Sequence, residues 1–262
     1  MKDFKTISTV INGQVVTLWL ARPDTHNSFN GVMISEITTF FTELEEEDNL
    51  RIVVIRGEGK SFCSGADLTW MRKSFTLTDQ DNLKECEALS VMFKSIYHCS
   101  KIVIAAVHGN VFGGGVGLVA VCDLAYCLSN CRFSLSETRL GMAAASITPY
   151  LLQKIRPADL KELIFTAKSF DGKTAVRYGI INQTMSDQEA LDLHLNKITS
   201  SILANGKQAV TESKKLINRL STKMMSEEIE RIPALLAKIR LSAEVQEGFT
   251  AFLEKRAPKW QE

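Results

Sequence analysis

The 262-residue sequence predicts an α/β fold followed by a C-terminal helical region. Three observations lead to this prediction. Short runs rich in β-branched residues recur along most of the chain, amphipathic helical patterns separate them, and the last part of the chain contains helical patterns alone. We place an α/β core at residues 1–190 and a helical region at 191–262. The hydrophobic fraction of 45% is enough to fill one large core.

Four runs are predicted to be strands because each is apolar, β-branched and bounded by Gly, Pro or polar residues. They span residues 14–23, 51–57, 101–109 and 180–185. The stretches between them carry apolar residues at the spacing of one helix face. These residues are Ile34, Ile37, Phe41 and Leu44 in the first helix, and Cys86, Leu89, Phe93 and Ile96 in the second.

The C-terminal region begins with a capping box, Ser-Asp-Gln-Glu at 186–189, which predicts a helix capped by Ser186. The Asn-Gly pair at 205–206 predicts the end of that helix. Two apolar stripes follow the capping box, Leu191, Leu195, Ile198 and Ile202 in this helix, then Leu241, Val245, Phe249 and Phe252 in a later one.

The charge balance argues against a nucleic-acid partner. There are 31 basic and 30 acidic side chains, with no basic block that could follow a phosphate backbone. No apolar run reaches the length of a membrane span, and the first ten residues lack the apolar centre of a signal peptide. We therefore expect a cytoplasmic protein that has no membrane partner.

The cysteines and histidines do not form a metal-binding pattern. The six cysteines include no Cys-x-x-Cys pair and several lie in apolar stretches, so we expect buried, reduced thiols. The four histidines are scattered, without a His-Glu-x-x-His motif. We expect no metal site.

Three consecutive glycines, Gly113–Gly115, precede an apolar stretch of helical length. Helix-on-strand packing, a dinucleotide loop and an anion hole made of helix N-terminal amides could each require them. The dinucleotide fingerprint fits loosely, because the preceding strand ends near Val107, several residues too early. A second small-residue turn, Ser64–Ala66, also follows an apolar strand. Two such turns can each direct one backbone N–H at the same oxygen, as in an oxyanion hole.

The chain resembles the enoyl-CoA hydratase/isomerase family, the crotonase superfamily, over almost its full length. The resemblance is carried by "RPDTHNSFN" (22–30), "GKSFCSGADL" (59–68), "IAAVHGNVFGGGVGLVAVCD" (104–123) and "EGFTAFLEKRAPKW" (247–260). It implies a crotonase-like spiral of ββα units, with residues 191–262 as a trimerisation region. It also implies a homotrimer or dimer of trimers that binds an acyl-CoA thioester and needs no cofactor beyond the coenzyme A of its substrate.

The resemblance implies that the N–H groups of Ala66 and Gly114 hold the thioester oxygen, with Gly113 beside the substrate. Of the family's two catalytic acid positions, one is Glu137 and the other is Gly117, a departure from the family pattern that we expect beside the substrate. This departure weakens any claim to hydration by two glutamates. From local sequence alone, Glu137 could also be an exposed acid at a helix cap. We expect a packing or solvent-facing position for His108 and a structural role for Asp123.

The segments "GADLTWMR" (65–72) and "SETRLGMAAASITPY" (136–150) resemble the bacterial methylglutaconyl-CoA hydratase branch. A substrate of that branch ends in a carboxylate, so a cation should line the pocket, with Arg72 and Arg139 as candidates. Solvent-facing positions are the alternative for both arginines. The resemblance places a further set of residues near coenzyme A: Arg22, Ala66, Asp67, Leu68, Phe252 and Lys255.

The sequence therefore predicts a hydratase that adds water to an α,β-unsaturated acyl-CoA, 3-methylglutaconyl-CoA, with Glu137 as the acid/base. An enoyl-CoA isomerase that moves a double bond with the same glutamate is one alternative. A non-catalytic acyl-CoA-binding subunit is the other, because Gly117 departs from the family at a catalytic position.

Overall fold

Two sheets form the frame of the molecule in the computed structural model, which describes residues 4–222 and 226–259. The larger sheet has the strand order β1-β2-β3-β5-β7-β10, and each neighbouring pair is parallel except β1 and β2. Its strands are β1 (Ile7–Asn12), β2 (Val15–Leu20), β3 (Ile52–Gly57), β5 (Ile102–Val107), β7 (Leu124–Leu128) and β10 (Gln183–Met185).

The smaller sheet has the order β4-β6-β8-β9 and consists of very short strands. These are β4 (Ser61–Cys63), β6 (Asn110–Phe112), β8 (Arg132–Ser134) and β9 (Phe170–Asp171). In each of the pairs β3/β4, β5/β6 and β7/β8, the first strand joins the large sheet and the second joins the small one. A helix follows each pair, so the chain repeats a ββα unit and the predicted α/β fold is confirmed.

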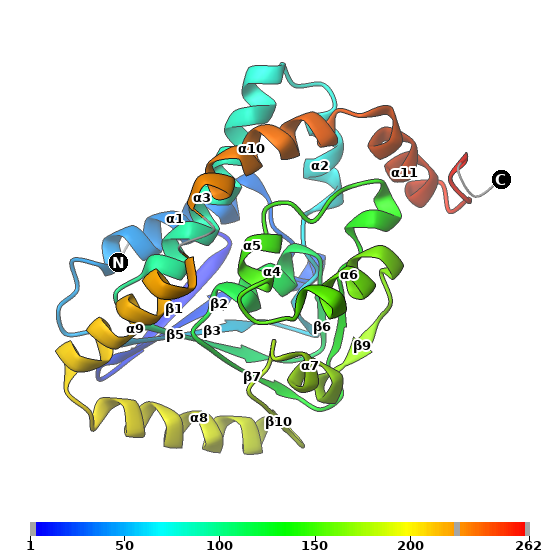
Figure 1. Ribbon diagram of the computed structural model, residues 1–262. Coiled ribbons are helices and arrows are strands. Elements are labelled where there is room, and N and C mark those ends of the chain that lie inside the picture. Colours follow the sequence, from blue (N-terminus) through cyan, green and yellow to red (C-terminus); the bar gives the residue numbers. More distant parts are fainter. Residues whose placement is uncertain (1–3, 223–225, 260–262) are drawn as a thin grey trace.

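Helices cover both faces of the large sheet (Figure 1). On one face, the main core packs against α1 (Gly31–Leu44), α3 (Asp79–His98) and α4 (Gly114–Val121). On the other face lies α8 (Gln188–Leu203), whose Leu191 and Leu195 pack on a second cluster from β3, β5 and β7. Because most strands are buried on both faces, they read as continuous apolar runs in the sequence.

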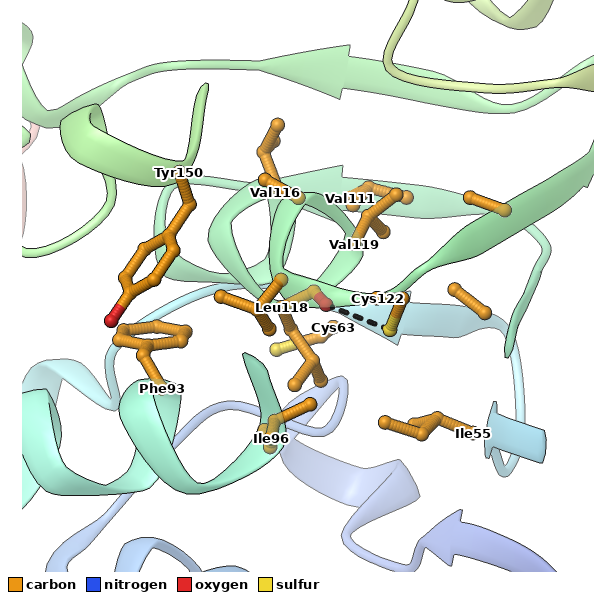
Figure 2. Packing of buried hydrophobic residues seen from close by; sticks show 14 of the residues in the cluster. Ile55, Cys63, Phe93, Ile96, Val111, Val116, Leu118, Val119, Cys122 and Tyr150 are labelled. Atoms are coloured by element: carbon orange, nitrogen blue, oxygen red, sulfur yellow. Dashed lines mark hydrogen bonds between the residues drawn. The ribbon is translucent and has the colours of Figure 1, made fainter. Parts of the chain in front are cut away.

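The helix after the glycine cluster, α4, is buried on nearly every side (Figure 2). Its side chains from Val116 through Val121 contact the sheets on one side, and Phe93 and Tyr150 lie nearby. A helix surrounded by protein has no polar face, which explains its uniformly apolar sequence. This burial fixes the position of the N-terminus of α4, where the glycines lie.

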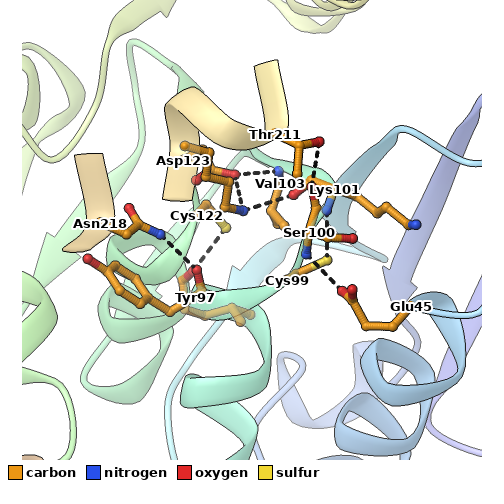
Figure 3. Close-up of polar contacts among 12 residues, drawn as sticks. Glu45, Tyr97, Cys99, Ser100, Lys101, Val103, Cys122, Asp123, Thr211 and Asn218 are labelled. Carbon is orange, nitrogen blue, oxygen red and sulfur yellow. Dashed lines mark hydrogen bonds and ion pairs between the residues drawn. The ribbon is translucent and has the colours of Figure 1, made fainter. Parts of the chain in front are cut away.

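A mostly buried ion pair ties the C-terminal helices to the core, and Figure 3 shows its carboxylate, Asp123. Lys214 on α9 (Lys207–Thr222) donates from Nζ to Asp123 Oδ2 at 2.6 Å and to the Lys101 carbonyl at 2.8 Å. Asp123 also accepts from the Val103 N–H, so the carboxylate joins α9 to the start of β5. The expected structural role of Asp123 is confirmed in these contacts.

Beyond β10, the described residues form helices only. In Figure 1, α10 crosses α3 and leads to α11 beside α2. The remaining helices are η1 (Pro23–Thr25), α2 (Leu68–Ser74), η2 (Glu137–Leu140), α5 (Thr148–Leu151), α6 (Pro157–Thr166), α7 (Gly172–Tyr178), α10 (Ser226–Arg240) and α11 (Ala243–Leu253). The boundary at residue 190 and the trimerisation role of the helical region stay predictions. Trp260, the last residue of the C-terminal motif, lies outside the described residues.

Several details differ from the predicted elements. The N-cap of α8 is Asp187, not Ser186, because its carboxylate accepts from the Ala190 N–H at 2.8 Å. The strand predicted at 14–23 ends at Leu20, and Pro23 starts a short 3₁₀ turn. The apolar stripe at the C-terminus is shorter than predicted, since Phe252 is 56% exposed. The prediction for cysteine is confirmed: all six are free and buried.

Candidate active site

A cavity of about 790 Å³ opens where the ends of the ββα units meet. Segments far apart in the chain line it: the loop at 25–29, the turn at 64–66, the glycines 113 and 114, the loop at 142–147 and the C-terminal helices. Most of this lining is apolar, with a few polar groups among the apolar side chains. Such a cavity is the common form of a small-molecule site.

The two small-residue turns meet at this cavity. A Cβ on Gly65 would lie 3.3 Å from the Gly114 nitrogen, so the two turns are in van der Waals contact. Gly65 has φ +88°, a conformation that side-chain-bearing residues rarely adopt. This turn is held by a backbone bridge, in which Phe29 N–H donates to Gly65 O and Asp67 N–H donates to Phe29 O, both at 2.7 Å.

The N–H groups of Ala66 and Gly114 donate to no acceptor among the described residues. Both residues line the cavity, and Gly114 is the first residue of α4. The positive end of the helix dipole therefore faces the same region as the two free donors. Together these features favour a developing negative charge on a ligand oxygen.

Glu137 begins η2 and lines the same cavity. Its Oε2 is buried without a hydrogen-bond partner, and a Cβ on Gly113 would lie 3.1 Å from Oε1. Burial raises the pKa of this carboxyl to about 7, against which one hydrogen bond from its own backbone acts. The alternative of an exposed helix-cap acid is therefore wrong, because the carboxyl lies against Gly113 with its Oε2 buried. A carboxyl with a pKa near neutrality can both take up and release a proton at pH 7.

Gly117 does not reach the cavity, although the resemblance placed it beside the substrate. It is fully buried on α4, and a Cβ there would lie 2.1 Å from Ile147 Cγ2 and 3.3 Å from Phe93 Cζ. Ile147 lines the cavity instead. The assignment of Gly117 as a substrate-binding residue is corrected, because the Ile147 side chain separates it from the cavity.

The predicted cation of the pocket is only partly supported by the structure. Arg139 lines the cavity and donates from Nη2 to the Ala167 carbonyl at 2.6 Å. Arg72 lies exposed on α2 and is not part of the lining. Its assignment to the pocket is corrected, since its side chain is exposed and the adjacent Met71 is the buried residue that lines the cavity.

The residues predicted near coenzyme A divide between the cavity lining and its surroundings. Asp67, Leu68 and Phe252 line the cavity. Arg22 lies outside the lining and donates to Asp67 Oδ2 at 2.8 Å and to the Ser28 carbonyl at 2.6 Å, so it joins two cavity loops. Lys255 is exposed and outside the lining as well. Contact of any of these residues with coenzyme A stays a prediction.

Ser146 and Arg240 are among the cavity residues that the sequence analysis did not identify. Ser146 is buried and its Oγ has no hydrogen-bond partner among the described residues. Arg240 is 1% exposed at the end of α10 and reaches the cavity from 103 residues beyond Glu137 along the chain. No local pattern marks either one, since a serine in an alanine-rich loop and an arginine at a helix end are both ordinary surface features.

Other candidates lie elsewhere. His108 is outside the cavity lining, and one of its ring nitrogens lies 3.0 Å from the Gly59 carbonyl oxygen. Over residues 4–222 and 226–259, no group of three or more His, Cys, Asp or Glu side chains is close enough to hold a metal ion. In the same part of the chain, no helix is long and apolar enough to cross a membrane.

Comparison with known proteins places this site in context. A family described as enoyl-CoA hydratase/isomerase matches residues 10–262. A Dictyostelium discoideum mitochondrial Delta(3,5)-Delta(2,4)-dienoyl-CoA isomerase is 31% identical, over 93% of this chain and 86% of its own. A crotonyl-CoA hydratase of Syntrophomonas wolfei is also 31% identical, over 93% of each chain. The crystal structure of an enoyl-CoA hydratase from Shewanella pealeana has a TM-score of 0.80 and 32% identity, covering 98% of this chain and 96% of that one.

Proposed function

Because the chain belongs to the enoyl-CoA hydratase/isomerase family of enzymes, we propose that it adds water across the α,β double bond of an enoyl-CoA thioester. The observation that carries the proposal is the juxtaposition of one buried carboxyl, Glu137, with two free backbone donors, Ala66 and Gly114, in a single cavity. The first group moves a proton and the other two stabilise an oxyanion, which are the two requirements of chemistry through a thioester enolate.

In this proposal, the Glu137 carboxylate removes a proton from water while the water oxygen bonds to the β-carbon. The π electrons move toward the thioester, whose oxygen becomes an enolate oxygen held by the N–H groups of Ala66 and Gly114. Glu137, now protonated, returns the proton to the α-carbon. Each backbone donor directed at the developing oxyanion typically lowers the activation free energy by roughly 3 to 4 kcal/mol.

Ser146 provides the second group for holding the water. Its Oγ is buried and unpartnered and belongs to the same lining as Glu137. The loop that carries it is anchored at one end by the Met142 N–H on the Glu137 carbonyl and at the other by the Thr148 N–H on the Ala144 carbonyl, both at 3.0 Å. A hydroxyl can both donate to and accept from a water molecule, as a second carboxylate would accept from it.

We propose 3-methylglutaconyl-CoA as the substrate, which implies a cation in the acyl part of the cavity. Arg139 and Arg240 are lining residues of the right charge, and Arg139 already donates to the Ala167 carbonyl. The reaction consumes water and no cofactor beyond the coenzyme A of the substrate, and we place it in the cytoplasm. Incubation with crotonyl-CoA and with 3-methylglutaconyl-CoA, following loss of the conjugated thioester absorbance, tests the proposal. Loss of absorbance with neither compound would contradict it.

The isomerase remains the second candidate, favoured by the single cavity glutamate with a pKa near 7 and by the likeness to the dienoyl-CoA isomerase. Glu137 would then remove a proton from one carbon and return it to another, without water. Formation of a conjugated product from a 3-enoyl-CoA, together with no hydration of 2-enoyl-CoA thioesters, would identify this activity.

We also propose that the chain assembles as a homotrimer or a dimer of trimers. Leu216, Ile217 and Leu220 are 47%, 62% and 68% exposed on α9. Neighbouring exposed apolar side chains of this kind are typical of a surface that another subunit covers. Light scattering of the purified protein measures the assembly, and a monomer at micromolar concentration would contradict this proposal.

A further inference from the structure

The end of α10 places a buried arginine against the cavity. Arg240 is 1% exposed and lines the cavity together with Trp70 and Met71 of α2. In Figure 1, α10 crosses α3 on its way to this point. A charged side chain this deeply buried is rare unless its charge and its donors are satisfied.

The guanidinium of Arg240 is satisfied along only one side. Nη1 donates to Asn82 Oδ1 at 3.2 Å and to Glu85 Oε2 at 3.1 Å. Nη2 has only the Met71 sulfur, at 3.4 Å, and Nε has no partner among the described residues. The face of the group lies over Trp70, with Cζ 4.9 Å from the ring centroid. Asn82 and Glu85 thus hold the arginine in place, while the N–H groups of Nε and Nη2 have no oxygen acceptor among the described residues.

The unused donors form a defined recognition element. Nε–H and one Nη2–H are parallel and spaced to match the two oxygens of a carboxylate, which a lysine ammonium cannot reproduce. A thioether is a weak acceptor, so the Met71 contact leaves this edge nearly unsatisfied. Leaving such donors buried costs free energy that a bound acceptor would recover.

The surroundings define where on a ligand that acceptor lies. The cavity wall beside Arg240 is apolar, formed by residues of α2, α3, α10, α11 and the loop after Glu137. These residues are Met71, Leu89, Met142, Leu236 and Phe249. A wall of this composition suits an acyl chain rather than the hydrated phosphates of coenzyme A.

We propose that the Nε–Nη2 edge of Arg240 binds a carboxylate at the distal end of the acyl group, once the flexible Met71 side chain that contacts Nη2 moves aside. This subsite deepens the proposed function, on which it rests for the thioester that anchors the other end of the ligand. Glu85 balances the arginine in the free protein, and its side chain is 30% exposed, so its repulsion of a second carboxylate is partly screened by solvent. Trp70 Nε1 donates to the other Glu85 oxygen at 3.1 Å, which fixes the ring beneath the guanidinium.

The test measures the binding of two saturated, unreactive thioesters by calorimetry. Glutaryl-CoA ends in a carboxylate, whereas valeryl-CoA has the same number of acyl carbons but no terminal carboxylate. The wild-type protein should bind glutaryl-CoA roughly tenfold or more tightly than valeryl-CoA. Arg240→Met should abolish that preference while leaving the Kd for valeryl-CoA within about threefold. Arg72→Met is the matched control, because this arginine is exposed outside the cavity and its loss should leave the preference unchanged.

Arg240→Lys keeps the buried charge but lacks the fork, and serves if Arg240→Met fails to fold, as thermal melting will show. It should reduce the preference for glutaryl-CoA at least severalfold. No preference in the wild-type protein, or a preference that survives either Arg240 variant, would overturn the subsite. Binding needs no turnover, so a protein that shows the preference but hydrates no enoyl-CoA would retain the subsite and lose the proposed reaction.

Discussion

Ile147 occupies the space that a side chain at Gly117 would need. A Cβ at position 117 would lie 2.1 Å from Ile147 Cγ2 and 2.8 Å from its Cβ. The departure at Gly117 is therefore part of the packing of this chain: α4 and the start of α5 close together where the resemblance implies a second acid. The loop at 142–147 fills that place and brings Ser146 to the cavity.

Gly117→Ala should destabilise the fold by about 1 to 3 kcal/mol, because the added methyl group overlaps Ile147 in a closely packed core. Urea unfolding measures this change. Gly206→Ala is the matched control, since the nearest atom to its new Cβ is Ala209 Cβ at 3.8 Å. Equal stability of the two variants would show that the space at Gly117 is not filled.

Glu137→Gln should lower kcat by about 10²-fold to 10⁴-fold, because the amide keeps the shape of the carboxyl but cannot accept a proton. The Kd for a saturated acyl-CoA should change little, since the Ala66 and Gly114 donors remain. Initial rates with crotonyl-CoA and calorimetry with butyryl-CoA provide the two measurements. Full activity in the variant would remove Glu137 from the reaction.

The pH dependence should follow the same carboxyl. Burial raises the pKa of Glu137 to about 7, and hydration requires the ionised form. In the wild-type protein, kcat/KM for crotonyl-CoA should rise with pH and level off above an inflection near 7. An inflection near the ordinary glutamate value of 4.5, with no change between pH 6 and 8, would contradict this assignment.

Stability should depend on pH in the opposite direction. The folded state holds the Glu137 proton more tightly than the unfolded chain, so the stability contributed by this group falls as pH rises from 4.5 to about 7. Glu137→Gln removes this effect, and the variant should gain about 2 kcal/mol more over wild type at pH 8 than at pH 5. Urea unfolding at both pH values measures the difference, and the same gain at both would disprove the burial of the charge.

Ser146→Ala should separate the two candidate reactions. If this hydroxyl holds the attacking water, its removal should lower hydration of crotonyl-CoA by about tenfold or more, while proton exchange at carbon by Glu137 continues. The hydration assay and deuterium incorporation from heavy water at the γ-carbon of crotonyl-CoA, which Glu137 can deprotonate without water addition, report the two steps. Parallel loss of both would instead indicate a general disturbance of the cavity.

Much of the fold follows from the sequence because β2, β3 and β5 of the large sheet are long, apolar and β-branched, whereas β1 and β7 of the same sheet were not predicted. The strand predicted at 51–57 lies at Ile52–Gly57, and that predicted at 101–109 lies at Ile102–Val107. The strands of the small sheet were missed because three residues carry no periodicity, as in Ser61–Cys63. The predicted cap at Ser186 was wrong since the adjacent Asp187 offers the same kind of acceptor.

The residues of the candidate site also divide into those that the sequence predicts and those that it does not. Glu137 and the two turns are marked by local composition and by resemblance, and the structure brings them to one cavity. Arg240 could not be predicted, because its position depends on the packing of α10 against α3, and its Nη2 contacts Met71 from 169 residues away. Contacts at such separations are properties of the fold and leave no signal in a short stretch of sequence.

In the proposed reaction, one thioester oxygen binds both backbone donors while Glu137 faces the acyl carbons. A crystal structure of the Glu137→Gln variant with crotonyl-CoA would show whether the ligand binds in this way. We predict a thioester oxygen at about 2.7 to 3.1 Å from both the Ala66 and the Gly114 nitrogens, with the side chain at 137 next to the α- and β-carbons. A thioester oxygen bound to neither nitrogen, or acyl carbons directed away from residue 137, would contradict the account.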